Sequence, residues 1–189
     1  ILAETGKAVL GKDDVLRRIL TAILAGGHIL IDDIPGVGKT TMAVAFTRTL
    51  GLDYKRMQFT PDVLPSDITG FSMYDKASGS FRYVAGSAMT NFFLADEINR
   101  ASPKTQSALL EVMQDGCLSV DGKTYTVPQP FIVMATQNPI GSSGTQELPE
   151  SQTDRFMIRI TVGYPSRENE IEILKGVSPQ QLVAEHQPL

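Results

Sequence analysis

The sequence predicts an α/β fold in which a mostly parallel sheet is covered by helices on both faces. The chain has 189 residues, 42% of them hydrophobic and 20% charged, which is ordinary for a globular domain and excludes collagenous, coiled-coil and disordered classes. Compact apolar runs alternate with segments of helical periodicity. Parallel strands need such crossovers, so the alternation favours a parallel sheet.

The first half of the chain predicts helix, strand, glycine loop and helix in that order. Apolar residues recur at helical spacing over 13–25, with Asp13 as the expected N-cap. The run at 28–31 predicts a buried strand. A helix is then expected over 39–50, ended by Gly51.

The rest of the chain continues this alternation and adds two hairpins. Ser102 is the expected N-cap of the next helix, and the Asp121-Gly122 pair predicts a tight hairpin turn. The predicted elements are a strand at 54–59, an irregular Pro- and Asp-rich segment at 61–70, a hairpin at 71–84, a strand at 91–97, a helix at 102–116, a hairpin at 117–127, a strand at 131–137, a short helix at 148–156, a strand at 157–162 and a helix at 166–176 capped by Ser166.

Composition removes several classes of function. The formal net charge is −4, so no global positive field attracts nucleic acid. The apolar run at 19–31 is too short to cross a bilayer. His28 and His186 are the only histidines, so the composition does not favour a zinc site or a Ser-His triad. Cys117 is the only cysteine, and we expect it to have a packing role in a cytoplasmic protein.

The segment PGVGKTT at 35–41 stands between a predicted strand and a predicted helix. Backbone N–H groups of such a loop and the positive end of the helix bind phosphates, with Lys39 reaching the outer phosphates and the Thr40 hydroxyl binding Mg²⁺. Asp33 occupies the position where the general pattern has its first glycine. The alternative is a Gly-Pro loop with a surface lysine.

Two carboxylates follow the apolar strand at 91–97, at the edge where ligands bind in open α/β sheets. Successive strand residues point to opposite sides, so Asp96 is expected to hold Mg²⁺ through water while Glu97 polarises the attacking water. The alternative is a pair of solvated acids that simply ends the strand.

Asn138 follows the strand at 131–137, where its amide is expected to orient the attacking water. Arg155 is the candidate arginine finger, since guanidinium stabilises spreading phosphate charge. Arg100 and Arg159 are weaker candidates for the same interface. The alternatives are a turn-forming asparagine and an ordinary ion pair from Arg155 to Asp154 or Glu150.

The motifs PGVGKTT, FFLADEINRA, ATQNP and LPESQTDRF, in this order, resemble the MoxR family of AAA+ ATPases over residues 11–175. The resemblance implies a P-loop NTPase (AAA+) three-layer sandwich with a central, mostly parallel five-stranded sheet and β-hairpin insertions. It also implies that the loop strand is central and is flanked by the Asp-Glu strand and the Asn strand.

The same resemblance implies ATP/ADP and Mg²⁺ as ligands and assigns roles to residues. Lys39 and Thr40 match Walker A, Asp96 and Glu97 match Walker B, Asn138 matches sensor 1, Arg155 matches the arginine finger, and Val9 and Gly11 lie in the stretch near adenine. The loop residues that complete the phosphate cradle are Pro35, Gly36, Val37, Gly38 and Thr41.

Family members work as ring homo-oligomers, commonly hexamers, and resemble chaperones that remodel protein clients, often with a von Willebrand factor A domain partner. The two hairpins are expected to engage partners. Residues 1–176 are expected to form the ATPase core and 177–189 a tail or the start of a helical lid. Two alternatives stay open: a DNA-associated AAA+ motor or loader, and a nucleotide-binding assembly module without turnover.

Overall fold

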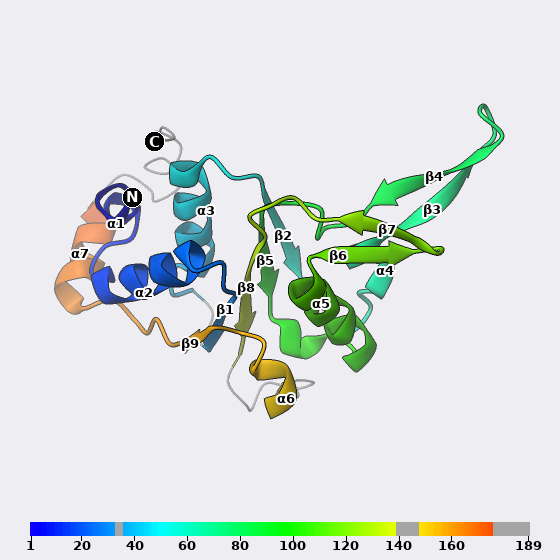
Figure 1. Ribbon diagram of the computed structural model, residues 1–189. Coiled ribbons are helices and arrows are strands. Elements are labelled where there is room, and N and C mark those ends of the chain that lie inside the picture. The colour runs from blue at the N-terminus through cyan, green and yellow to red at the C-terminus, as the bar shows by residue number, and fades with distance from the viewer. Residues whose placement is uncertain (33–35, 139–147, 176–189) are drawn as a thin grey trace.

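A parallel sheet of five strands runs through the middle of the protein (Figure 1). The structure is a computed structural model that describes residues 1–32, 36–138 and 148–175, without the side chains of 172–175. The strand order is β2-β5-β8-β1-β9. The strands are β2 (Tyr54–Gln58), β5 (Phe92–Asp96), β8 (Ile132–Gln137), β1 (Ile29–Asp32) and β9 (Ile158–Ile160).

The implied order of the central strands is wrong in one respect. The loop strand β1 lies between β8 and β9, and the Asp-Glu strand β5 lies beyond β8. The central strand is therefore β8, and all six of its residues are buried. A chain pattern of alternating strands and helices does not specify which strands are neighbours, whereas the complete burial of β8 fits a strand covered on both faces and both edges.

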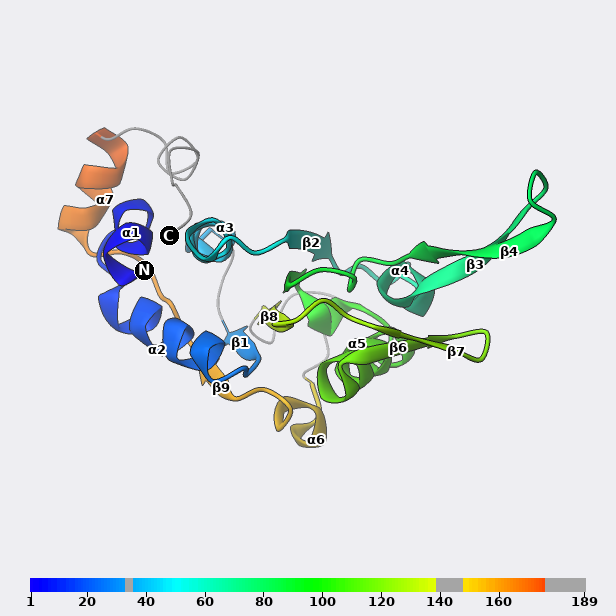
Figure 2. The same cartoon turned by 45° about the horizontal axis from the view of Figure 1, so that its top comes forward.

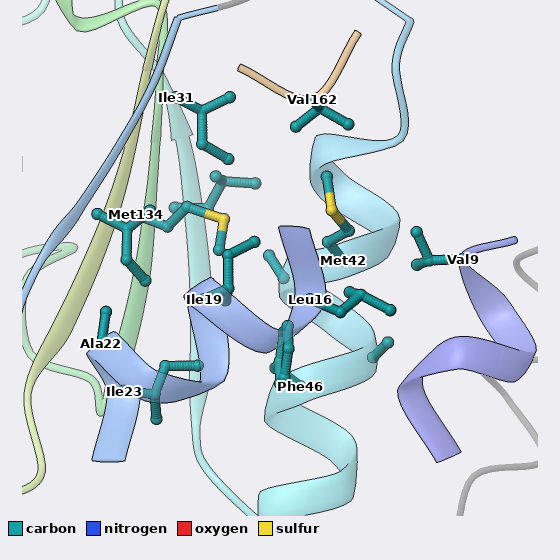
Figure 3. Close-up of a cluster of buried hydrophobic side chains, with 14 of the residues drawn as sticks. Val9, Leu16, Ile19, Ala22, Ile23, Ile31, Met42, Phe46, Met134 and Val162 are labelled. Carbon is teal, nitrogen blue, oxygen red and sulfur yellow. The ribbon is translucent and has the colours of Figure 1, made fainter. Parts of the chain in front are cut away.

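One face of the sheet is covered by α2 (Asp13–Leu24) and α3 (Lys39–Leu50), and α1 (Leu2–Ala8) packs against these two helices. Alternate strand residues such as Ile31 and Met134 pack there against Ile19 of α2 and Phe46 of α3 (Figure 3). The period of two along each strand sends the intervening residues to the opposite face. The helix α7 (Arg167–Lys175) follows β9 and lies beside α1 and α2 in Figures 1 and 2.

The opposite face is covered by α5 (Pro103–Asp115) and α4 (Pro65–Thr69), which pack on Leu30, Phe93 and Val133. Two antiparallel hairpins extend from this side, away from the N-terminal helices (Figure 2). They are β3–β4 (Gly70–Asp75 and Ser80–Ala85) and β6–β7 (Cys117–Val120 and Lys123–Thr126). Tyr83 and Tyr125 stack with ring centroids 3.9 Å apart and join the two hairpins.

Most predicted elements are confirmed, including the turn at Asp121 and Gly122, both in positive-φ conformations. Ser102 accepts a hydrogen bond from the Thr105 N–H, as an N-cap does, and Ser166 accepts one from the Asn169 N–H. The short helix predicted at 148–156 is α6 (Glu150–Thr153), and the strand predicted at 157–162 shortens to β9.

Two predictions of local structure need correction. Asp13 is the first residue of α2, and the N-cap is Lys12. The segment 61–70 contains α4, because Pro65 suits a first helical position and the Asp67 carboxylate accepts a hydrogen bond from the Leu64 N–H. The sequence pattern also missed α1, which has a glycine in its middle. Among the described helices, none combines the length and apolar character needed to span a membrane.

Candidate functional site

The loop before α3 uses glycine where the backbone requires it. Gly36 has φ 89° and Gly38 has φ 87°, which side chains with a Cβ rarely adopt. Gly38 is the N-cap of α3 and offers no side-chain cap, so the first-turn N–H groups are left for another acceptor. This is the arrangement that binds anions. Asp33 and Pro35, which the sequence placed in this loop, lie outside the described residues.

A cleft of ≈ 340 Å³ opens at the start of α3, where the carboxyl ends of β2, β5 and β8 meet. It brings together five side chains that the sequence assigned to one site from separate motifs, those of Lys39, Thr40, Asp96, Glu97 and Asn138, beside residues of the predicted phosphate cradle. Its lining consists of Gly36, Gly38, Lys39, Thr40, Thr41, Arg56, Gln58, Asp96, Glu97 and Asn138. The Lys39 side chain belongs to a residue that is only 8% exposed, which contradicts the alternative of a surface lysine.

Asp96 is the last residue of β5, and it is also only 8% exposed. Its Oδ1 accepts a hydrogen bond of 2.8 Å from the Thr136 hydroxyl. Its Oδ2 accepts two from Arg56, at 2.9 Å from Nε and 2.7 Å from Nη2. Both carboxylate oxygens are therefore engaged, and the acid is held rigidly at the rim of the cleft.

Glu97 does not continue the strand, which corrects the expectation that both acids alternate along β5. Its φ is 55°, a left-handed conformation that costs a non-glycine residue about 1–3 kcal/mol. The turn is held because the Glu97 N–H donates to the Thr136 hydroxyl oxygen at 2.9 Å. Thr136 thus supports both acids, and the strained backbone turns the Glu97 side chain towards β8 and Asn138.

The Glu97 carboxylate has two partners. Oε1 accepts from Asn138 Nδ2 at 2.9 Å, and Oε2 accepts from Arg100 Nη1 at 2.9 Å. Asn99 fixes the backbone of Asn138, since its Nδ2 donates to the Asn138 carbonyl at 3.2 Å. Within the described residues, the buried Asn138 Oδ1 has no hydrogen-bond partner, and such an atom is an acceptor ready for a water.

Other predicted site residues lie outside this cleft. Arg155 follows α6, is exposed, and among the described residues forms no ion pair with Asp154 or Glu150. The weaker finger candidates are both engaged within the chain, Arg100 with Glu97 and Arg159 with Asp32.

The stretch expected near adenine is placed beside the phosphate loop rather than in the cleft. Val9 is buried in the same cluster as Val37 and Val162. Gly11 has φ 68°, and a Cβ there would overlap the Asn169 side chain of α7. These residues fix the contact between the N-terminal segment and α7.

The cleft residues fit a magnesium nucleotide. Hydroxyl and carboxylate oxygens, from Thr40 and Asp96, are the hard donors that Mg²⁺ prefers. Glycine N–H groups and Lys39 suit phosphate oxygens. The fit is therefore to a polyphosphate with a small hard cation.

Sequence reasoning missed three residues of this site: Arg56, Gln58 and Thr136. Gln58 pairs in register with Asp96 across β2 and β5, which places the end of β2 at the cleft. Thr136 lies one residue before the end of β8, so it is the neighbour of Asp96 across the sheet. The alternation of apolar and polar residues carries no signal for such cross-strand neighbours until strand order is known.

The sequence of residues 28–158 matches the model of the ATPase family associated with various cellular activities (AAA). The chain belongs to this family. Its similarity to proteins named MoxR places it in the MoxR branch: it is 48% identical to Chaperone MoxR1 of Mycobacterium tuberculosis over 180 residues, which are 94% of this chain and 48% of that protein.

Further similarities agree with this membership. The chain is 52% identical over 168 residues to the uncharacterised protein YeaC of Bacillus subtilis, covering 89% of this chain and 52% of YeaC. A crystal structure from Cytophaga hutchinsonii, whose ATPase name is provisional, superposes with TM-score 0.83 at 40% identity, covering 96% of this chain and 59% of that one. The chain spans about half the length of the curated relatives it matches.

Proposed function

We propose that this AAA+ chain binds ATP with Mg²⁺, hydrolyses it to ADP and phosphate, and uses the cycle to remodel or activate protein complexes. The observation that carries the proposal is the meeting of the α3 start, with Lys39 and Thr40, and the Asp96–Glu97–Asn138 group in one cleft. Family membership supports the same reading.

The residues divide the work by position. The N–H groups at the start of α3 and the Lys39 ammonium hold the phosphates in place. Bound magnesium would supply charge neutralisation on the outer phosphates, with Thr40 and Asp96 as its protein-side oxygens. Glu97 would accept a hydrogen bond from the attacking water. Asn138 Oδ1, which has no hydrogen-bond partner among the described residues, would fix the orientation of that water.

Two substitutions separate binding from turnover. Lys39→Ala is expected to lose nucleotide binding, because the phosphates lose their cation. Glu97→Gln is expected to bind ATP but to release phosphate at least about 100-fold more slowly. Fluorescent-nucleotide titration and phosphate release on the purified protein measure both.

Exposed residues of the same types on α5 provide the controls, Lys104→Ala and Glu111→Gln, which should behave as wild type. Undiminished turnover in Glu97→Gln would contradict its assignment. Tight ATP binding without phosphate release in the wild-type protein would favour a nucleotide-binding assembly module instead.

We further propose that the protein works as a ring, with six subunits as the expected number, and that Arg155 completes the site of a neighbouring subunit. Its exposure and its lack of an ion pair among the described residues support this role. Arg155→Ala should bind ATP normally and turn over slowly. Mixing it with Lys39→Ala subunits should restore partial activity, because such rings contain intact composite sites; loss of ATP affinity in Arg155→Ala would contradict a role in trans.

The hairpin β3–β4 is the proposed contact for protein clients or for a von Willebrand factor A domain partner. Phe71, Met73, Tyr74 and Phe81 are large apolar residues exposed on it. Exposed aromatic side chains are typical of protein-binding surfaces. Steep, salt-sensitive stimulation of phosphate release by DNA would instead support the DNA-associated motor.

A further inference from the structure

Arg56 forms an ion pair with Asp96, at 2.7 Å from Nη2 to Oδ2, and was not part of the predicted site. It lies on β2, two residues before the strand ends at the cleft, and its side chain lines that cleft. Two of its nitrogens, Nε and Nη2, donate to a single oxygen, Asp96 Oδ2. The other carboxylate oxygen is already taken by the Thr136 hydroxyl. Arg56 therefore covers the Asp96 oxygen that the Thr136 hydroxyl leaves open.

This ion pair differs from one that only stabilises the fold. The Arg56 side chain is 47% exposed, whereas the Asp96 side chain is 11% exposed. The partner that can move is thus the arginine, and the partner that stays is the acid. Beside Asp96, the nearest further acceptor for Arg56 is Gln58 Oε1, at 3.5 Å from Nη2, so a second polar contact lies within reach along the same strand.

A guanidinium and a hydrated metal ion compete for the same carboxylate oxygen. Each is a cation that satisfies the Asp96 charge, and each would add a positive charge beside the other. The displaced guanidinium keeps Gln58 Oε1 within reach, and its 47% exposure lets water solvate it. Loss of Arg56 would therefore remove a competitor of the metal without removing a phosphate contact.

We propose that Arg56 is a built-in counter-ion that occupies Asp96 Oδ2 until a divalent cation displaces it, and that it thereby sets the metal affinity of the site. Arg56 is a positioning residue in this scheme, since it acts through Asp96. The proposal rests on the proposed function, because it requires the cleft to bind a magnesium nucleotide. Its distinguishing consequence is that removing the guanidinium strengthens metal binding.

The experiment compares Arg56→Gln with wild type, using Mn²⁺ as a paramagnetic probe. Fluorescent ADP is titrated first in EDTA, and then Mn²⁺ affinity is measured by electron paramagnetic resonance on the ADP-bound protein. Arg56→Gln should bind Mn²⁺ about tenfold more tightly, by analogy with the effect of one adjacent charge on a carboxylate. ADP affinity in EDTA should change less than about twofold.

Three further variants serve as controls for this experiment. Arg82→Gln removes the same charge from the exposed part of β4 and should leave Mn²⁺ affinity unchanged. Arg56→Met keeps an apolar stem of similar length, and it replaces Arg56→Gln if that variant does not fold. Arg56→Lys keeps the charge but replaces the forked guanidinium with one ammonium nitrogen. Its Mn²⁺ affinity should therefore lie between those of wild type and Arg56→Gln.

The outcomes that overturn the inference are distinct from failure of the proposed function. Unchanged or weaker Mn²⁺ affinity in Arg56→Gln, with normal ADP binding, would overturn the counter-ion role alone. A large loss of ADP affinity in EDTA would make Arg56 a phosphate ligand and would also overturn it. Wild-type protein that binds no nucleotide, with or without metal, would overturn the proposed function and this inference together.

Discussion

Two phenylalanines mark two regions of the molecule that use apolar surface differently. Phe46 of α3 is 0% exposed and packs between the sheet and α2, in the body formed by the sheet and its helices (Figure 3). Phe81 is 69% exposed on the hairpin β3–β4, where its ring meets that of Tyr74 edge-on at 5.4 Å between centroids. The same side chain is thus a core residue in one region and a surface residue in the other.

The difference is one of anchoring. The base of β3–β4 is fixed to the body and to the second hairpin. The Tyr83 hydroxyl donates to the Thr69 carbonyl of α4 at 2.6 Å, and the Tyr83 ring stacks on Tyr125 of β6–β7. Beyond this point the hairpin projects from the body (Figure 2). Apolar area stabilises the fold only where folding removes it from water, so the outer hairpin contributes little to stability and retains its aromatic surface for contacts.

The largest expected effect is in the body. Phe46→Ala should lower the free energy of unfolding by about 3–5 kcal/mol, because it opens a cavity between α2, α3 and the sheet. Urea unfolding followed by circular dichroism measures it. A loss below about 1 kcal/mol would show that this layer is loosely packed and would remove the contrast with the hairpin.

The next effect concerns the polar part of the body, at the cleft. Thr136→Val keeps the shape of the side chain but removes the hydroxyl that donates to Asp96 and accepts from the Glu97 N–H. Stability should fall by about 1–3 kcal/mol because two buried groups lose a partner, and phosphate release should slow as the two acids lose their support.

Thr49→Val is the matched control for that substitution. Its hydroxyl is also buried, but it donates only to the Ala45 carbonyl within the same helix, so its loss should cost less. Equal costs at the two positions, with unchanged phosphate release in Thr136→Val, would contradict the supporting role of Thr136.

The phosphate loop, most elements and five residues of the cleft could be predicted because their signals are local. Gly36 and Gly38 supply the positive φ that the loop requires. Ser102 is the N-cap of α5, and Gly116 ends that helix in a left-handed conformation. Strand order, by contrast, is a property of the assembled sheet. That is why one of the two neighbours of β1 was predicted wrongly, with β5 expected where β9 lies, and why Arg56 and Thr136, which reach Asp96 from adjacent strands, were missed.

A conformation can also be hidden because it is strained. Glu97 adopts φ 55° without being glycine or asparagine, so nothing in its residue type predicts that it leaves the strand direction. The hydrogen bond from its N–H to Thr136 supplies the reason, and that partner lies far away in the sequence. The strained position coincides with the acid proposed to act on water.

The third prediction concerns the pH dependence of stability, which tests the packing of His28 in the body. His28 accepts the Val133 N–H at Nδ1, 3.1 Å away, so the neutral ring carries its proton on Nε2, which lies 3.0 Å from the Met113 carbonyl. Burial lowers the pKa of His28 below its ordinary value of 6.5, although the hydrogen bond to Met113 raises it. The folded state therefore binds the His28 proton less readily than the unfolded chain does.

Stability from this pKa shift is fully present above about pH 6.5 and is lost as pH falls towards the lower folded pKa. Urea unfolding at pH 7.5 and 5.5 should show wild type losing more stability than His28→Gln, which cannot titrate. Carboxylates with lowered pKa, such as Asp75 and Glu168, titrate mainly below this range. Equal pH dependence in the two proteins would contradict the role of His28.

The smallest expected effect is on the hairpin, and it is the sharpest test of the comparison. Phe81→Ala should change the free energy of unfolding by less than about 0.5 kcal/mol, since the side chain is 69% exposed and its ring contact with Tyr74 is edge-on, and nucleotide binding should be unchanged. Urea unfolding of Phe81→Ala and Phe46→Ala under the same conditions compares the two losses in free energy of unfolding directly. A loss of about 2 kcal/mol or more would mean that Phe81 is buried in the working protein, by a neighbouring subunit or a partner that stays bound, and the hairpin would then belong to a cooperative interface rather than to a free surface.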